Sequence, residues 1–178
     1  MKITAFAASS SSRSINRQLV GYVLTHFPEA TINLLDLNDF EMPVFSVDRE
    51  SGDGYPQEAR DFLRQLEAAD LIIVSMAEHN GHFTAAFKNI LDWCSRIELK
   101  LFRNKPMLLM STSPGDYGGR NALEAAVTRF PKHGATIIDT FSLPSFYDNF
   151  SPGHGILDAI LKAALLEKIA KVKEHLPG

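Results

Sequence analysis

Five short apolar segments, separated by longer stretches with helical periodicity, constrain the fold of this chain more than any other feature. The segments are "KITAFAA" (2–8), "TINLLDL" (31–37), "DLIIVSM" (70–76), "KPMLLMS" (105–111) and "ATIIDTFSL" (135–143). Each segment is nearly continuous in apolar residues, which is typical of strands that are buried on both faces. A sheet built from such strands needs helices on both of its sides.

The stretches between these segments have the periodicity of helices, which we expect over residues 14–27, 56–69, 83–96, 119–133 and 155–175. Strands that are joined through helices run parallel, and their right-handed crossovers place helices on both faces of the sheet. The sequence therefore predicts an α/β fold, a three-layer doubly wound sandwich around a five-stranded parallel sheet. A length of 178 residues suits a single domain over 1–178.

Composition excludes several classes of partner. The chain has 18 basic and 21 acidic residues, a formal charge of −3, and no block of like charge, so we expect neither nucleic acid nor an anionic membrane as partner. Cys94 is the single cysteine, which excludes an internal disulfide, and it reads as a packed thiol beside Trp93. The apolar runs are too short for a signal peptide or a membrane span, which favours the cytoplasm.

Three loops at the expected carboxyl ends of the strands are rich in small and polar residues. They read "SSSSRSIN" (9–16), "AEHNGHF" (77–83) and "TSPGDYGGR" (112–120). In open parallel sheets a ligand binds beyond the carboxyl ends of the strands, where the winding direction reverses. We therefore expect the ligand site of this protein to be formed by these loops.

The first loop combines serines with the start of a predicted helix. Backbone N–H groups at a helix N-terminus are unpaired and attract anions, and the hydroxyls of Ser9, Ser11, Ser12 and Ser14 and the amide of Asn16 add donors. This pattern predicts a phosphate site; the alternative is one capping serine in a solvated loop. Neither GxGxxG nor GxxxxGK[ST] is present, which argues against a dinucleotide-fold dehydrogenase and an NTPase.

Glycines dominate the loop after the fourth strand. Gly115, Gly118 and Gly119 allow positive φ angles and leave backbone amides open to a flat ligand. The alternative is an ordinary Pro-Gly turn that leads into a helix. Histidines near these loops lack the spacing of metal ligands, so we expect no metal site.

Taken together, "SSSSRSIN" (9–16), "EHNG" (78–81) followed by "KNILDW" (88–93), and "SPGDYGG" (113–119) resemble the NADPH-dependent FMN reductase family of flavodoxin-like proteins. The three motifs have the order and spacing of that family, and they cover the chain from the first strand to the fourth helix. The resemblance implies a flavodoxin-like fold, FMN as cofactor and NADPH as the source of hydride.

The resemblance also implies which residues hold the cofactor. Residue by residue, they are Ser9, Ser11, Ser14, Ile15 and Asn16 around the phosphate, Ala77, Glu78, His79 and Asn80 beside the isoalloxazine ring, and Ser113, Pro114, Gly115, Gly118 and Gly119 at its pyrimidine end. No catalytic side chain is implied.

Three positions depart from the family pattern. Ser11 stands where the family has arginine, Ala77 replaces a proline and His79 replaces a tyrosine. Loss of the arginine removes a charge-assisted contact to phosphate, for which Arg13 and Arg17 are candidate replacements.

The resemblance predicts a flavoenzyme that passes reducing equivalents from NAD(P)H through bound FMN to a small-molecule acceptor such as flavin or a quinone. One alternative is a flavodoxin-like electron carrier that does not oxidise nicotinamide, although a net charge of −3 with scattered signs fits acidic docking poorly. Another is a flavin-free scaffold protein, which the residues at positions 11 and 79 leave open.

A homodimer or homotetramer is also expected. The predicted helix 83–96 resembles the one at which family members pair, and Phe87, Ile90 and Trp93 give it a partly apolar surface. The alternative is that this helix is wholly buried against the sheet. The segment 143–155 contains Phe146, Tyr147 and Phe150, and it is expected to cover the site or to contact a partner subunit.

Overall fold

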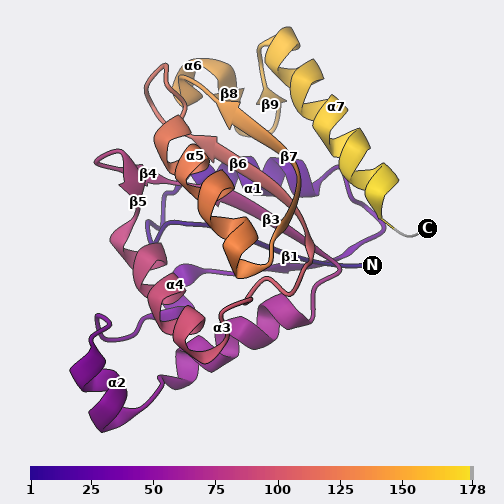
Figure 1. The fold of residues 1–178 in the computed structure, drawn as a ribbon. Helices are drawn as coiled ribbons and strands as arrows, with labels where there is room; N and C mark the ends of the chain where they lie inside the picture. The colour runs from indigo at the N-terminus through magenta and orange to yellow at the C-terminus, as the bar shows by residue number, and fades with distance from the viewer. Residues whose placement is uncertain (177–178) are drawn as a thin grey trace.

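The computed structural model describes residues 1–176, which form a parallel sheet between two layers of helices (Figure 1). The strands of this sheet are β1 (Lys2–Ala7), β2 (Thr31–Leu34), β3 (Leu71–Met76), β6 (Pro106–Thr112) and β7 (Thr136–Leu143). Their order is β2-β1-β3-β6-β7, and every neighbouring pair is parallel. The winding direction reverses between β1 and β3, as the alternating pattern of the sequence predicts.

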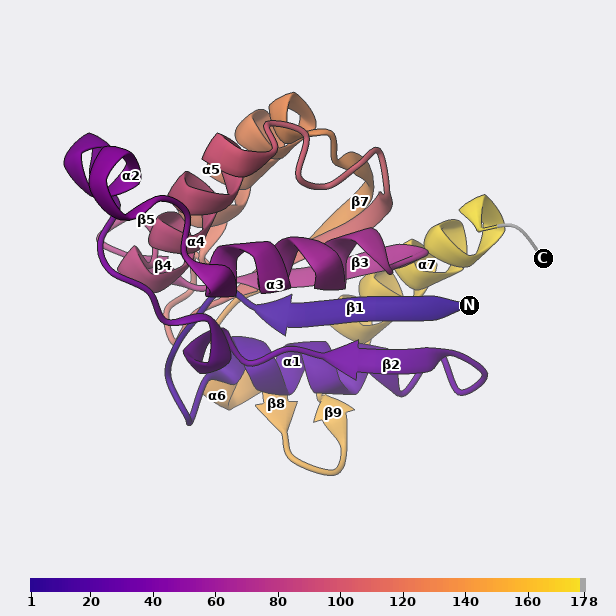
Figure 2. The ribbon, with the colours of Figure 1, turned by 90° about the horizontal axis from the view of Figure 1, so that it is seen from below.

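Helices cover both faces of the sheet (Figure 2). One face is covered by α3 (Gln57–Glu67), α4 (Ala85–Ile97) and α5 (Arg120–Arg129), and the other by α1 (Ile15–Leu24) and α7 (Ala159–His175). The predicted three-layer doubly wound α/β sandwich is therefore confirmed. No helix within residues 1–176 is long and apolar enough to cross a membrane.

The apolar character of the strands follows from the two layers. In β1, Phe6 packs under α3 and α4, whereas Ile3 and Ala5 pack under α1, and all three side chains are fully buried. In β3, Val74 and Ile73 divide between the two faces in the same way. Burial on both faces removes the alternation with polar residues that a half-exposed strand would show.

Several short elements lie outside the sequence-based prediction. They are η1 (Leu37–Phe40), α2 (Val47–Asp53), α6 (Phe146–Asn149), and the hairpins β4 (Glu78–His79) with β5 (His82–Phe83) and β8 (Phe150–Ser151) with β9 (Gly155–Ile156). The predicted second strand ends early, at Leu34, because Leu37 and Phe40 turn into the core from a 3-10 helix. Helix α2 projects from the body of the protein and buries no residue, so its sequence carries no apolar stripe (Figures 1 and 2).

The start predicted for the last helix, Gly155, is wrong. Gly155 belongs to β9, and α7 begins at Ala159 with Asp158 as its N-cap. The φ angle of Gly155 is +74°, and a Cβ atom at this position would overlap the ring of Tyr22 in α1. Close packing of the β8–β9 hairpin on α1 thus requires a glycine at this position.

The apolar residues of α4 are part of the chain's own core. Phe87, Ile90 and Trp93 are only 1–2% exposed, and the indole Nε1 of Trp93 donates a hydrogen bond to the carbonyl of Pro43 at 2.7 Å. The expectation of a partly apolar helix surface is therefore wrong for these side chains, and the homodimer or homotetramer stays a prediction. Cys94 is also buried, and this burial raises the pKa of its thiol to about 12, as expected for a packed thiol.

His26 follows α1 and is partly buried, with its Nε2 atom shielded from solvent. Its ring packs edge to face on Tyr22 at 5.1 Å, and Nε2 has no hydrogen-bond partner within residues 1–176. Burial lowers the pKa of the imidazole below its usual value of 6.5, and the charges of Lys173 and Lys162 lower it further. The folded protein thus favours the neutral ring.

The His26 pKa predicts acid-sensitive stability. Because the pKa is lower in the folded state, the unfolded chain binds more protons once the pH falls toward 6.5, and the free energy of unfolding decreases until the pH lies below the folded pKa. We expect His26→Leu to flatten this dependence between about pH 7.5 and 5, as measured by urea unfolding. His154→Gln, at an exposed histidine in the β8–β9 turn, is the control. An unchanged slope in His26→Leu would contradict the assignment.

Candidate functional site

The three loops converge on one cavity of about 220 Å³ at the carboxyl end of the sheet. The cavity is lined by Ser9, Ser11, Arg13, Ser14, Ile15, Asn16, Ala77, Glu78, His79, Thr112, Ser113, Pro114 and Tyr147. Most of the predicted site residues are therefore brought together. The exceptions, Asn80, Gly115, Gly118 and Gly119, lie in the same loops but outside the lining.

The serine loop both caps α1 and leaves backbone donors free. The Ser14 hydroxyl accepts a hydrogen bond from the N–H of Arg17 at 3.2 Å, which is the capping role that one serine was expected to fill. The N–H groups of Ser12, Arg13 and Ile15 have no acceptor within residues 1–176. A cavity at a helix start with unpaired N–H groups and exposed hydroxyls is suited to an anion.

Asn16 connects this loop to two strands of the sheet. Its side-chain oxygen accepts hydrogen bonds from the Ser75 hydroxyl at 2.7 Å and the Thr112 N–H at 3.1 Å, and its Nδ2 donates to the Thr112 carbonyl at 3.1 Å. The residue is only 3% exposed. Asn16 therefore positions the loop through these internal bonds, and its role as a phosphate donor stays a prediction.

Glu78 connects the β4–β5 hairpin to the loop that follows β6. Its carboxylate accepts hydrogen bonds from Asn121 Nδ2 and from the N–H of Ala122, both at 3.1 Å. Helix α5 starts after Gly119, which has no side chain to cap it, so Glu78 supplies the cap from a different element. Its negative charge is directed at the helix start, while His79 stays exposed at the cavity.

Gly118 and Gly119 allow backbone conformations and close contacts that a residue with a side chain would not. Their φ angles are +64° and +72°, and a Cβ atom at Gly118 would overlap the hydroxyl of Ser142 and lie 3.1 Å from the backbone carbon of Leu143. The Gly118 carbonyl also accepts hydrogen bonds from Ser111 Oγ at 2.7 Å and Ser142 Oγ at 3.0 Å. By contrast, the Cβ position of Gly115 faces open space, and Gly115 lies outside the lining of the cavity.

A strap after β7 forms one wall of the cavity. The N–H groups of Ser145 and Phe146 donate to the carbonyls of Gly115 at 2.8 Å and Ser113 at 3.1 Å. Phe146 is buried and stacks on Phe150 at 4.7 Å, while Tyr147 is 70% exposed and lines the cavity. Tyr147 and Thr112 were missed as site residues by the sequence interpretation, although the segment 143–155 was expected near the site.

Of the two candidate replacements for the missing arginine, only Arg13 lines the cavity. Arg17 is engaged elsewhere, because its guanidinium donates to the carbonyl of Leu35 at 3.1 Å and lies 3.3 Å from Asp36. Hydrogen bonds from Asn38 hold the pKa of the Asp36 carboxyl below its usual value, which keeps this ion pair charged. Arg13 forms no ion pair within residues 1–176.

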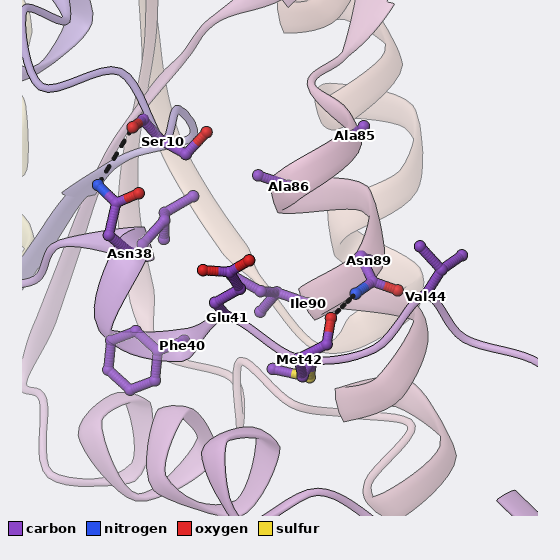
Figure 3. A pocket seen from close by; sticks show the side chains of 11 residues that line it. Ser10, Asn38, Phe40, Glu41, Met42, Val44, Ala85, Ala86, Asn89 and Ile90 are labelled. Carbon is purple, nitrogen blue, oxygen red and sulfur yellow. Dashed lines mark hydrogen bonds between the residues drawn. The ribbon is translucent and has the colours of Figure 1, made fainter. Parts of the chain in front are cut away.

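A second hollow of about 290 Å³ lies on the other side of the serine loop, between η1 and α4 (Figure 3). Its amide groups are used in internal hydrogen bonds: Asn38 Nδ2 donates to the Ser10 carbonyl at 3.1 Å, and Asn89 Nδ2 donates to the Met42 carbonyl at 3.0 Å. Figure 3 shows Glu41 and Ile90 facing the same space. The bond from Asn38 to Ser10 supports the serine loop from this side. The residues that line this hollow include no lysine, arginine or histidine.

The fold and the cavity define a flavodoxin-like protein with a serine-rich loop at the point where the sheet reverses its winding. Residues 1–148 match the NADPH-dependent FMN reductase family, and the chain belongs to that family. An NAD(P)H-dependent FMN reductase of Pseudomonas aeruginosa is 28% identical over 126 residues, covering 68% of this chain and 65% of the relative. A quinone reductase of Escherichia coli is 28% identical over 79 residues, 44% of this chain and 42% of the relative, so the match spans less than half of that protein.

Solved structures support the fold. FerB of Paracoccus denitrificans, described as a flavoenzyme NAD(P)H:(acceptor) oxidoreductase, has a TM-score of 0.74 at 18% identity, and the match covers 99% of both chains. An azoreductase of Bacillus anthracis has a TM-score of 0.68 at 19% identity, covering 97% of this chain and 99% of the other. At these identities the likeness concerns the fold, and the flavodoxin-like expectation is confirmed.

Asn16 provides a test of how the site is held together. Asn16→Leu would leave the Thr112 N–H, the Thr112 carbonyl and the Ser75 hydroxyl without partners in a buried place, each at a cost of ~1–3 kcal/mol. We expect the free energy of unfolding to fall by about 3 kcal/mol or more in urea titrations without flavin. Ser75→Ala, which removes one bond, should cost about 1 kcal/mol. A loss in Asn16→Leu no larger than that of the control would refute the positioning role.

Proposed function

We propose that this protein is an NAD(P)H-dependent FMN reductase that passes reducing equivalents through bound FMN to a quinone, a flavin or a similar small acceptor. The observation that carries the proposal is the cavity in which the three family motifs meet, with unpaired N–H groups and hydroxyls at one end. The names of its relatives, among them a quinone reductase and an NAD(P)H-dependent FMN reductase, support the same activity.

The residues of the cavity fit FMN. A terminal phosphate needs several donors that converge on one point, and the serine loop offers the N–H groups of Arg13 and Ile15, the Ser9 and Ser11 hydroxyls and the guanidinium of Arg13. The carboxylate nearest to the cavity, Glu78, is directed at the start of α5 and bonded there. The chain also lacks the GxGxxG turn that suits a dinucleotide's pyrophosphate, which favours FMN over FAD.

When bound, FMN supplies the chemistry of accepting a hydride from a nicotinamide and donating electrons onward. The protein's own residues bind FMN and orient it. Ser113 and Pro114, which line the cavity, would lie along one side of the flat ligand, and His79 with Tyr147 would offer ring surfaces beside it. The fixed strap and the capped start of α5 hold these groups in place, which is the preorganisation that such a site needs.

Steady-state turnover tests the proposal directly. The purified protein with added FMN is expected to oxidise NADPH or NADH when a quinone or excess flavin is present, and the rate is followed by loss of nicotinamide absorbance. The colour of the protein and the identity of the flavin released on denaturation establish the cofactor. Bound FMN without oxidation of either nicotinamide would favour an electron carrier, and a protein that binds no flavin would favour a scaffold.

The serine loop is tested with a matched pair of variants. Ser11 and Ser12 are neighbouring exposed residues, but only Ser11 lines the cavity. Ser11→Glu places a carboxylate against the phosphate, so we expect the Kd for FMN to rise by about tenfold or more, equivalent to about 1.4 kcal/mol. Ser12→Glu adds the same charge outside the cavity and should change the Kd by less than about threefold, because solvent screens it. Equal Kd values in the two variants would place the phosphate elsewhere.

A further inference from the structure

A cavity of about 240 Å³ between α4 and α5 lies outside the site described above. The hairpin of β4 and β5 contributes to both cavities. Glu78 and His79 line the cavity proposed to hold FMN, here called the flavin cavity, while His82 and Phe83 line this one. The hairpin leads into α4 and lies beside α5 (Figure 1). The cavity begins at this hairpin and extends along α4 and α5 to Arg129, in the last turn of α5.

A buried histidine orients an arginine on the rim of this cavity. His133 is 2% exposed, its Nδ1 lies 2.8 Å from the Leu99 carbonyl, and its Nε2 lies 3.1 Å from Arg129 Nε. Because a guanidinium only donates, Nε2 is the acceptor, and the ring's proton is on Nδ1, donated to Leu99. Arg129 is thus held through Nε alone, and the N–H groups of its two terminal nitrogens remain available.

The rim carries an uncompensated positive charge. Lys88 is neutralised by Asp92, since its Nζ lies 2.7 and 2.8 Å from the two carboxylate oxygens. Arg129 has no carboxylate within 4.0 Å in the part of the chain that the structure describes. An oriented guanidinium with free terminal N–H groups matches the geometry of a phosphate, which it can bind through two parallel hydrogen bonds.

The floor of the cavity is apolar. Phe83 and Leu91 are 7% and 5% exposed, and Ala125 completes the surface between the helices. An apolar floor beside a phosphate-binding rim suits a nucleotide, with the base on the floor and the phosphate on the rim. The cavity is smaller than the ~300–1,000 Å³ typical of sites that enclose a whole small ligand, so it fits one end of a longer molecule.

We propose that this cavity binds the 2′-phosphoadenosine end of NADPH, with Arg129 holding the 2′-phosphate, while the nicotinamide end reaches around the hairpin to the flavin cavity. The inference rests on the proposed function. It makes Arg129 the residue that selects NADPH over NADH, and His133 the residue that positions Arg129. NADH has a hydroxyl in place of the 2′-phosphate and gains nothing from the guanidinium.

Cofactor preference in the holoenzyme tests the proposal. Arg129→Gln is expected to raise the KM for NADPH by about tenfold, and to leave the KM for NADH within twofold and both kcat values unchanged. Lys132→Gln removes an equal charge from an exposed neighbour that does not line the cavity, and should change none of these constants. Equal changes with NADPH and NADH in Arg129→Gln, or no change with either, would overturn the proposal.

Binding without turnover separates this proposal from the proposed function. In calorimetric titrations, 2′,5′-ADP should bind the wild type more tightly than 5′-AMP or inorganic phosphate, and Arg129→Gln should lose this preference. That result would uphold the nucleotide site even if the protein failed to oxidise any nicotinamide. Equal affinity for inorganic phosphate and 2′,5′-ADP would reveal a simple anion site, and no binding of 2′,5′-ADP would exclude the site; either result overturns the proposal.

Discussion

The site depends on one buried amide. Asn16 lies in the first turn of α1, yet its side chain hydrogen-bonds to Ser75 of β3 and to both backbone groups of Thr112 in β6. These strands end next to each other in the sheet, and each leads into one of the loops that form the cavity. A buried amide that satisfies its partners fixes the relative position of the elements it joins, because each lost bond would leave a polar group without water.

A second connection complements this one. Glu78 carries a charge in the hairpin after β3, and it caps α5, which follows the glycine loop after β6. The two interactions together tie the serine loop to the sheet and the hairpin to the glycine loop. The cavity therefore keeps its shape through contacts below and beside it, while the N–H groups of Arg13 and Ile15 stay free of internal bonds within residues 1–176.

The fold was predictable because each strand is buried on both faces and each crossover helix has an apolar face. The five strands and five long helices follow from that pattern, with ends displaced by a few residues. Helix α2 was not predictable, since it buries nothing and its residues carry no periodic signal. The β8–β9 hairpin was missed because its requirement, a glycine against Tyr22, depends on a contact between distant parts of the chain.

The candidate site was also predictable only in part: the sequence indicated which loops meet, but it did not indicate what each residue does. Motif order brought the serine loop, the hairpin and the glycine loop together correctly, because their strands are neighbours in the sheet. The motifs did not reveal what each residue does: Asn16 and Glu78 hold other elements, and Gly118 accommodates Ser142. Such roles depend on partners 24 to 96 residues away, and spacing within a motif carries no information about them.

Helix α7 has a consequence for how the chain acquires its structure. Leu165, Ile169 and Val172 seal the apolar face formed by β6 and β7, next to the area that α1 covers. During synthesis the strands and the whole motif-bearing region emerge first, and this face stays exposed to water until residues 159–175 have left the ribosome. The nascent chain therefore exposes apolar sheet surface until α7 has been synthesised, and this surface is the kind that a chaperone binds.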